Sequence, residues 1–172
     1  MELPLHPKLV HLPIALAILM PLLAAVLSAA LLRGWLPLRS WLLAIGTQAL
    51  LFGSSLLAMR TGEADEDRVE PFVPEAALEA HEEAAERFTW AAGLLLLVSC
   101  SPLLLHRRRG TAHWAALATT AGSLGILWLG YQVGQAGGEL VYRHGAANAF
   151  VTVGPSSQGQ TPPVRGDDDD DH

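Results

Sequence analysis

The chain has 172 residues, of which 51% are hydrophobic and only 16% are charged, with a formal net charge of −6 at neutral pH. A soluble globular domain usually carries about 25% charged residues, so this composition argues against one and favours a single membrane domain. No nucleic-acid-binding patch is visible, and the single cysteine, Cys100, excludes an internal disulfide or a thiolate metal cluster.

Four apolar blocks without charged residues follow one another along the chain, at residues 12–32, 40–59, 88–105 and 114–138. About 20 apolar residues cross a hydrocarbon core as a helix, and lipid offers no partner for backbone amides, so each block is predicted to span the membrane. The first block is longer than the apolar region of a signal peptide, about 7–15 residues, and is interpreted as a retained helix. The predicted fold class is therefore all-α, a four-transmembrane-helix bundle over residues 1–153.

The charges between the blocks predict an orientation. The loops 33–39 and 106–113 contain arginines and no acidic residue, whereas the segment 60–87 contains ten acidic residues and three arginines. Positive charge in short loops marks the cytoplasmic face, so both termini and the segment 60–87 are predicted to be extracytoplasmic, in a bacterium outside the cytoplasmic membrane.

One helix is predicted to extend beyond the outer surface, and a second is a candidate to do so. Residues 74–87 are expected to form a helix that runs into the third span, because Pro74 suits a first turn and His81 then shares a face with Phe88. The fourth span either continues to His144 or breaks at Gly137 and Gly138, and the pattern leaves this open. The tail 154–172, which ends in five aspartates and a histidine, is predicted to be disordered.

Four histidines map to the outer side and form the candidate binding site: His6, His11, His81 and His144. Imidazole is the usual protein ligand of haem iron and also suits zinc, copper and nickel. His6 and His11 would lie about 140° apart on a helix of 3.6 residues per turn, so they are not expected to hold one metal from the same face. His106 and His113 lie among the inner arginines and are interpreted as interfacial residues.

Two end motifs resemble a known family. The sequence H-P-K-L-V-H-L-P-I-A-L at residues 6–16 and G-G-E-L-V-Y-R-H-G at residues 137–145 are similar to the opening and closing motifs of the bacterial predicted membrane proteins called domain of unknown function 2231. Thr61-Gly62 and His81 also match family positions, while Leu12 replaces the usual Phe and Ala146-Ala147 the usual Gly-Val. The resemblance covers residues 6 to about 150. Relatives fused to Rieske or cytochrome c modules imply electron carriers as partners.

Three functions remain open from the sequence. The first is a b-type haem domain for electron transfer, in which small residues leave room for the macrocycle, namely Ala84, Ala85, Gly134 and Gly137. The second is a non-haem metal site with the same histidines, supported by Glu63, Asp65 or Glu82. The third is a structural or assembly subunit of a redox complex. The pair Gly130 and Gly134 would suit close helix packing within the bundle or in a homodimer. No independent catalytic activity is expected, because no nucleophile–base pair or phosphate loop is present.

Overall fold

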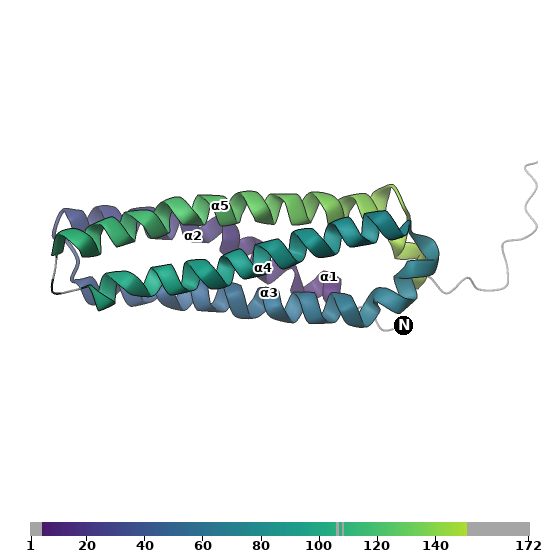
Figure 1. Ribbon diagram of the computed structural model, residues 1–172, viewed down its shortest axis with the longest axis horizontal. Helices are drawn as coiled ribbons and strands as arrows, with labels where there is room; N and C mark the ends of the chain where they lie inside the picture. Colours follow the sequence, from purple (N-terminus) through teal and green to yellow (C-terminus); the bar gives the residue numbers. More distant parts are fainter. Residues whose placement is uncertain (1–4, 106, 108, 151–172) are drawn as a thin grey trace, which may run out of the picture.

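The structure is a computed structural model that describes residues 5–105, 107 and 109–150. Four long helices lie side by side, and no strand occurs in this described part (Figure 1). The helices and 3-10 turns are α1 (His6–Leu9), α2 (His11–Leu32), η1 (Leu38–Trp41), α3 (Leu42–Val69), η2 (Glu70–Phe72), α4 (Glu75–Leu104), α5 (Arg109–Tyr142) and η3 (Ala146–Phe150). The predicted all-α bundle is confirmed, whereas the predicted tail 154–172 lies outside the described residues.

Three helical stretches are long and apolar enough to cross a membrane among the described residues, namely His6–Leu32, Leu38–Phe72 and Glu75–Leu104. The fourth predicted span, within α5, runs the length of the bundle over 34 residues but is not among them. It carries several hydroxyl and glycine residues that lower its hydropathy, and two of these, Thr119 and Ser123, are completely buried between helices. The coarser prediction of a membrane-spanning helical bundle therefore stands.

The helices extend well beyond the apolar blocks at one end of the bundle. α3 continues ten residues past Met59, the last residue of the predicted span, and ends at Val69. Pro74 is the N-cap residue of α4, and the helix runs unbroken from Glu75 into the apolar block, which confirms the predicted extension. α5 passes through both candidate breaking glycines to Tyr142, and Gly145, with φ of 74°, terminates the following turn.

Hydrogen bonds between helices fix their register inside the apolar core. The Trp41 indole N–H donates to the Ser99 carbonyl at 2.8 Å, and the Gln48 amide donates to the Ala92 carbonyl at 2.9 Å. Gly130 permits close packing, because a Cβ there would lie 3.3 Å from the Phe88 ring. Paired donors cost little when buried, so these two bonds hold the helices in one arrangement. The side-chain oxygen of Gln48 is buried without a hydrogen-bond partner among the described residues.

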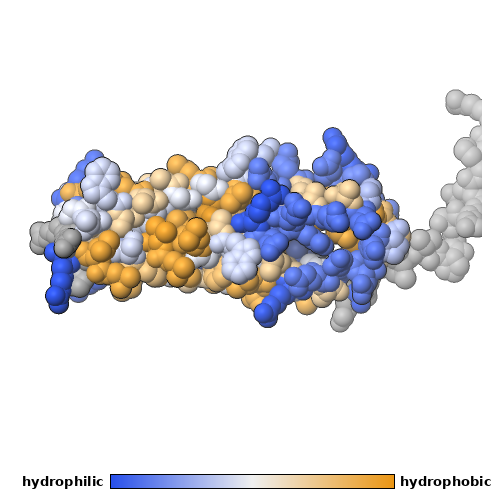
Figure 2. Space-filling model, viewed as in Figure 1, coloured by the Kyte–Doolittle hydropathy of each residue, from blue (hydrophilic) through white to orange (hydrophobic). Residues whose placement is uncertain are grey.

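The surface separates an apolar band from a polar end. Figure 2 shows hydrophobic residues over the middle of the bundle and a broad hydrophilic region at the end where α3 and α4 meet. A small second cluster of Val73, Leu140 and Ala146 closes this end, which also carries the Arg143–Glu139 ion pair. The extended helices thus form one polar end of the bundle.

Candidate functional site

His6 and His81 meet beside the extended end of the bundle, although 75 positions of sequence separate them. Their ring centres lie 6.2 Å apart with the planes nearly perpendicular, at 86°. His6 begins α1, which packs against α3, and His81 lies on α4 before its apolar block. His81 is half-buried, while neighbouring Glu79, Glu82 and Glu83 are exposed, so the prediction that His81 faces the bundle is confirmed.

The His6 ring is anchored on the last apolar turn of α3. Its Nδ1 lies 2.8 Å from the Ala58 carbonyl and 3.5 Å from the Thr61 hydroxyl. The Thr61 hydroxyl proton is directed to the carbonyls of Ala58 and Leu57, at 2.9 and 3.1 Å. Because a carbonyl can only accept, the His6 Nδ1 carries the proton and donates to Ala58.

The His81 ring is held differently. Its Nδ1 is buried and has no hydrogen-bond partner among the described residues. Burial, followed by repulsion from His6, lowers the pKa of His81 below its usual value, while a hydrogen bond to the Val133 backbone opposes this.

Each ring rests against a glycine of a neighbouring helix. A Cβ on Gly62 of α3 would lie 3.2 Å from Cε1 of His6, and a Cβ on Gly137 of α5 would lie 3.1 Å from Cε1 of His81. These contacts are tighter than ordinary van der Waals contact, so a side chain at either position would displace the ring. Four segments, α1, α3, α4 and α5, therefore contribute to one imidazole pair.

The other predicted ligands do not join this pair. His11 is exposed, and His144 lies half-buried just beyond the end of α5. No group of three or more His, Cys, Asp or Glu side chains that could hold a metal ion occurs in the part of the chain that the structure describes. His113 lies at the opposite end of the bundle, whereas His106 and His172 fall outside the described residues. The four-histidine constellation is thus reduced to His6 and His81.

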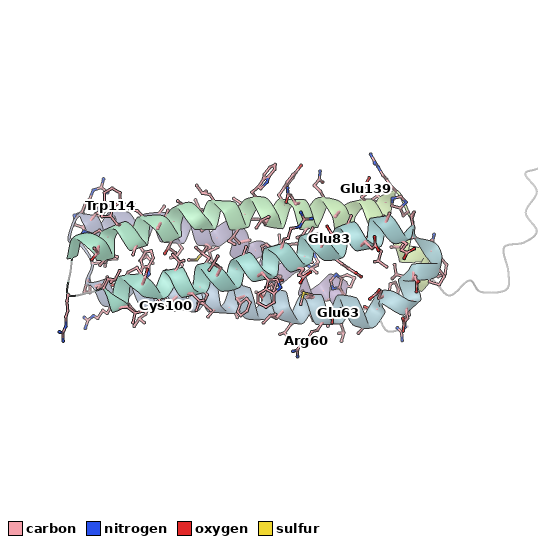
Figure 3. All side chains as sticks on the ribbon, viewed as in Figure 1. Arg60, Glu63, Glu83, Cys100, Trp114 and Glu139 are labelled. Carbon is pink, nitrogen blue, oxygen red and sulfur yellow. The ribbon has the colours of Figure 1, made fainter. Side chains whose placement is uncertain are left out.

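Carboxylates on α3 and α4 give this end of the bundle a negative potential. The pKa of Glu82 is raised by partial burial and then by repulsion from Glu66, Glu63 and Glu79. Figure 3 labels Glu63 on α3 and Glu83 on α4 on this half of the molecule. Glu83 pairs with Arg87 at 3.4 Å. Such a potential attracts cations to the polar end.

Two hollows flank α5, and no histidine lines either of them. One, of about 270 Å³, lies between α2 and α5 and includes Gly134, whose missing side chain leaves open space. The other, of about 400 Å³, lies between α4 and α5 and includes Ala84. The space predicted at Gly137 is instead taken by the His81 ring. The small residues therefore do not surround a single slot.

Sequence reasoning missed the groups that orient the rings. The Ala58 carbonyl that anchors His6 belongs to an apolar residue within α3, and nothing in its side chain identifies it. Thr61 and Gly62 were noted only through the family resemblance. A threonine after a span offers a hydroxyl group, and a glycine lets another side chain come close to the helix. This pair was the one signal in the sequence for the site that holds His6.

Comparison with known proteins gives one positive result. No curated protein and no solved structure shows a significant match to the chain. The profile of a family described as predicted membrane protein, DUF2231, matches residues 2–149, which include both end motifs, both histidines of the pair and their two glycines. The chain therefore belongs to the DUF2231 family of predicted membrane proteins.

Proposed function

We propose that this protein is a membrane-embedded electron-transfer domain that binds b-type haem, whose iron His6 and His81 would hold. The observation that carries the proposal is the 6.2 Å separation of the two imidazole centres. Metal–nitrogen bonds to imidazole are about 2.0–2.1 Å long, so two rings at this separation lie within reach of one metal atom between them.

The number of ligands favours haem iron over a bare ion. Structural and catalytic zinc sites use three or four protein ligands, whereas haem brings four nitrogens of its own and needs axial ligands from the protein. Two imidazoles meet in the described part of the chain, and no third His, Cys, Asp or Glu completes a metal-binding group with them. A two-histidine site is complete for haem and incomplete for zinc.

The surroundings of the pair suit a redox centre. The Ala58 carbonyl orients the His6 ring, as second-shell carbonyls orient metal-binding histidines in general. Half-burial of His81 lowers the local dielectric, which together with axial ligation sets a haem potential. Bound haem would supply one-electron chemistry, and the chain would hold, orient and shield the iron.

The test is an absorption spectrum of the purified full chain in detergent, oxidised and reduced, after reconstitution with haemin. We expect a Soret band that shifts on reduction, and its loss in His6→Ala and in His81→Ala. The variants His11→Ala and His144→Ala are matched controls that should retain it. Absence of the band in the unaltered chain, or equal loss in all four variants, would contradict the proposal.

A second candidate is a non-haem transition-metal site. The acidic residues around Glu82 favour cation binding near the pair. Metal analysis that finds a bound ion without a Soret band, lost in His6→Ala and His81→Ala, would support this candidate and exclude haem.

We also propose that α5 is the fourth span and that both termini are extracytoplasmic in a bacterial cytoplasmic membrane. α5 lies alongside the three apolar helices over 34 residues. The turn 33–37 and Arg107 lie at one end of the bundle, whereas the acidic extensions lie at the other. Positive charge in short connections marks the cytoplasmic face. Electron carriers of the cytochrome c or Rieske type would then be partners on the acidic side.

A further inference from the structure

We infer that the hollow between α4 and α5 binds a membrane phospholipid whose headgroup carries both a phosphate and a primary ammonium group. The hollow has a volume of about 400 Å³, and its lining includes Arg87 of α4 and Gln132 of α5. The inference does not depend on haem, and it takes α5 as a span, as proposed above.

Contacts between the antiparallel helices α4 and α5 fix which of their residues share a level. A Cβ on Gly130 would lie 3.3 Å from the Phe88 ring, so these two residues lie opposite each other. One residue further toward the polar end, Arg87 is therefore level with Tyr131. This level is the edge of the hydrocarbon, because Phe88 begins the charge-free block 88–105.

Two tryptophans mark the same edge from the lipid side. Trp90 and Trp128 lie two residues deeper than the Phe88–Gly130 contact, one on each helix, and both are exposed. Tryptophan is enriched where a membrane meets water. Deeper in the membrane, the exposed surface of the two helices continues with Leu94, Leu97 and Leu124. These leucines offer an acyl chain an apolar path below the headgroup.

Arg87 has the donors that a phosphate needs. Its Nε donates to the Glu83 carbonyl at 3.0 Å, and its Nη2 donates to the Glu83 carboxylate at 3.4 Å. A guanidinium has more N–H groups than these two bonds use. Both side chains are more than half exposed, and exposed ion pairs contribute little stability, so this pair does not prevent Arg87 from binding a phosphate oxygen. The Gln132 amide lines the same hollow.

The carboxylates beside Arg87 select the rest of the headgroup. Glu83 lies four residues further out on α4, which is about 6 Å at a rise of 1.5 Å per residue. Both side chains therefore lie within the polar layer of a bilayer, which is about 5–7 Å thick on each side. A headgroup with its phosphate at Arg87 and its ammonium at Glu83 satisfies both charges. An anionic headgroup would instead be repelled by the negative potential of this end.

The test is native mass spectrometry of the delipidated full chain in detergent, titrated with phosphatidylethanolamine, phosphatidylcholine or phosphatidylglycerol that carry the same acyl chains. We expect phosphatidylethanolamine to bind most tightly, because its primary ammonium donates hydrogen bonds to a carboxylate and the quaternary ammonium of phosphatidylcholine has no proton to donate. Equal affinities for the three lipids, or a preference for phosphatidylglycerol, would overturn the inference.

The variant Arg87→Gln is compared with Arg60→Gln. Arg60 directly follows the apolar block 40–59 of α3, as Arg87 precedes that of α4, but Arg60 does not line the hollow (Figure 3). We expect Arg87→Gln to weaken the affinity for phosphatidylethanolamine by roughly two- to fivefold, the range of partly exposed ion pairs. Arg60→Gln should leave it unchanged, and Arg87→Lys, which keeps a charge that binds phosphate, should retain most of it. Equal losses for Arg87→Gln and Arg60→Gln would overturn the site.

The variant Glu83→Gln separates the two halves of the headgroup. It should weaken the binding of phosphatidylethanolamine and strengthen that of phosphatidylglycerol, because it removes the partner of the ammonium and a repulsion on the anion. Far-UV circular dichroism identifies a loss of affinity that comes from misfolding. A dimer that Arg87→Gln dissociates would show that a second copy of the chain covers the hollow, and would overturn the inference. Failure of the haem reconstitution leaves it intact, since no histidine lines the hollow.

Discussion

Among the carboxylates that the structure describes, Glu82 is the one whose surroundings raise its pKa. Its pKa is raised above 4.5 by partial burial and by repulsion from Glu66, Glu63 and Glu79. The folded chain therefore binds this proton more tightly than the unfolded chain, and stability falls as pH rises through the window between 4.5 and the raised pKa. At neutral pH the charged side chain works against folding.

We expect Glu82→Gln to raise the stability at pH 7 by a few tenths of a kcal/mol, because the exposed charges are screened. The gain should disappear as pH falls below 4.5, where Glu82 is protonated in both states. Thermal unfolding in detergent at several pH values measures this. Glu83→Gln is the control, since Glu83 pairs with Arg87 and its removal should give no gain. A gain for Glu82→Gln that is independent of pH would contradict the electrostatic cause.

Residue patterns predicted which face His81 takes but not its partner. The 3.6-residue period places His81 above Phe88, and this was sufficient to turn it inward. The contact with His6 depends on the rotation of α1 relative to α4, which is set by packing across α3 and α5. No local sequence pattern predicts that rotation. His11 and His144 were therefore candidate ligands on the same footing as His6 and His81 before the structure was known.

At the scale of elements, the acidic stretch 60–69 shows why the apolar block alone does not predict the end of α3. Its charges resemble a loop between apolar blocks, yet Glu, Arg and Ala are good helix formers, and the first residue that cannot continue a helix is Pro71. The hydropathy of a segment indicates where it leaves the lipid, whereas a proline indicates where the helix itself can end. For α4 both the apolar block and Pro74 were used, and the predicted helix from Pro74 into the third span was confirmed.

The contact between α4 and α5 depends on a glycine in the core. A Cβ on Gly122 would lie 2.6 Å from a Leu95 methyl, and Leu95 is buried. We expect Gly122→Val to destabilise the bundle by about 1–3 kcal/mol more than Gly125→Val, because overpacking forces neighbours from their rotamers. Gly125 has open space on the same helix, so it controls for the helix propensity of valine.

Unfolding of both variants in mixed detergent micelles, with increasing dodecyl sulfate, measures the difference. Equal stabilities would show that α4 and α5 are packed less closely than the Gly122 contact requires. A larger loss of stability for Gly125→Val than for Gly122→Val would show that α5 packs against α4 through the face that carries Gly125.

At the scale of the whole molecule, orientation can be tested by labelling. In a Cys100→Ser background, we expect Glu75→Cys and Arg143→Cys to react with a membrane-impermeant maleimide in intact spheroplasts. Trp35→Cys and Arg107→Cys should react only after permeabilisation. All four positions are exposed. Because Arg107 and Arg143 flank α5, labelling of both from the same side would exclude α5 as a span and reverse the proposal for the C-terminus.

The extension of α4 beyond the lipid has a consequence for how the imidazole pair is reached. His81 precedes Phe88, where the apolar block begins, by seven residues, which at a rise of 1.5 Å per residue is about 10 Å along the helix. The polar layer on each side of the hydrocarbon is only about 5–7 Å thick. A hydrogen carrier dissolved among the acyl chains would stop short of that height. A carrier that exchanged electrons with the proposed haem would therefore have to reach it through water.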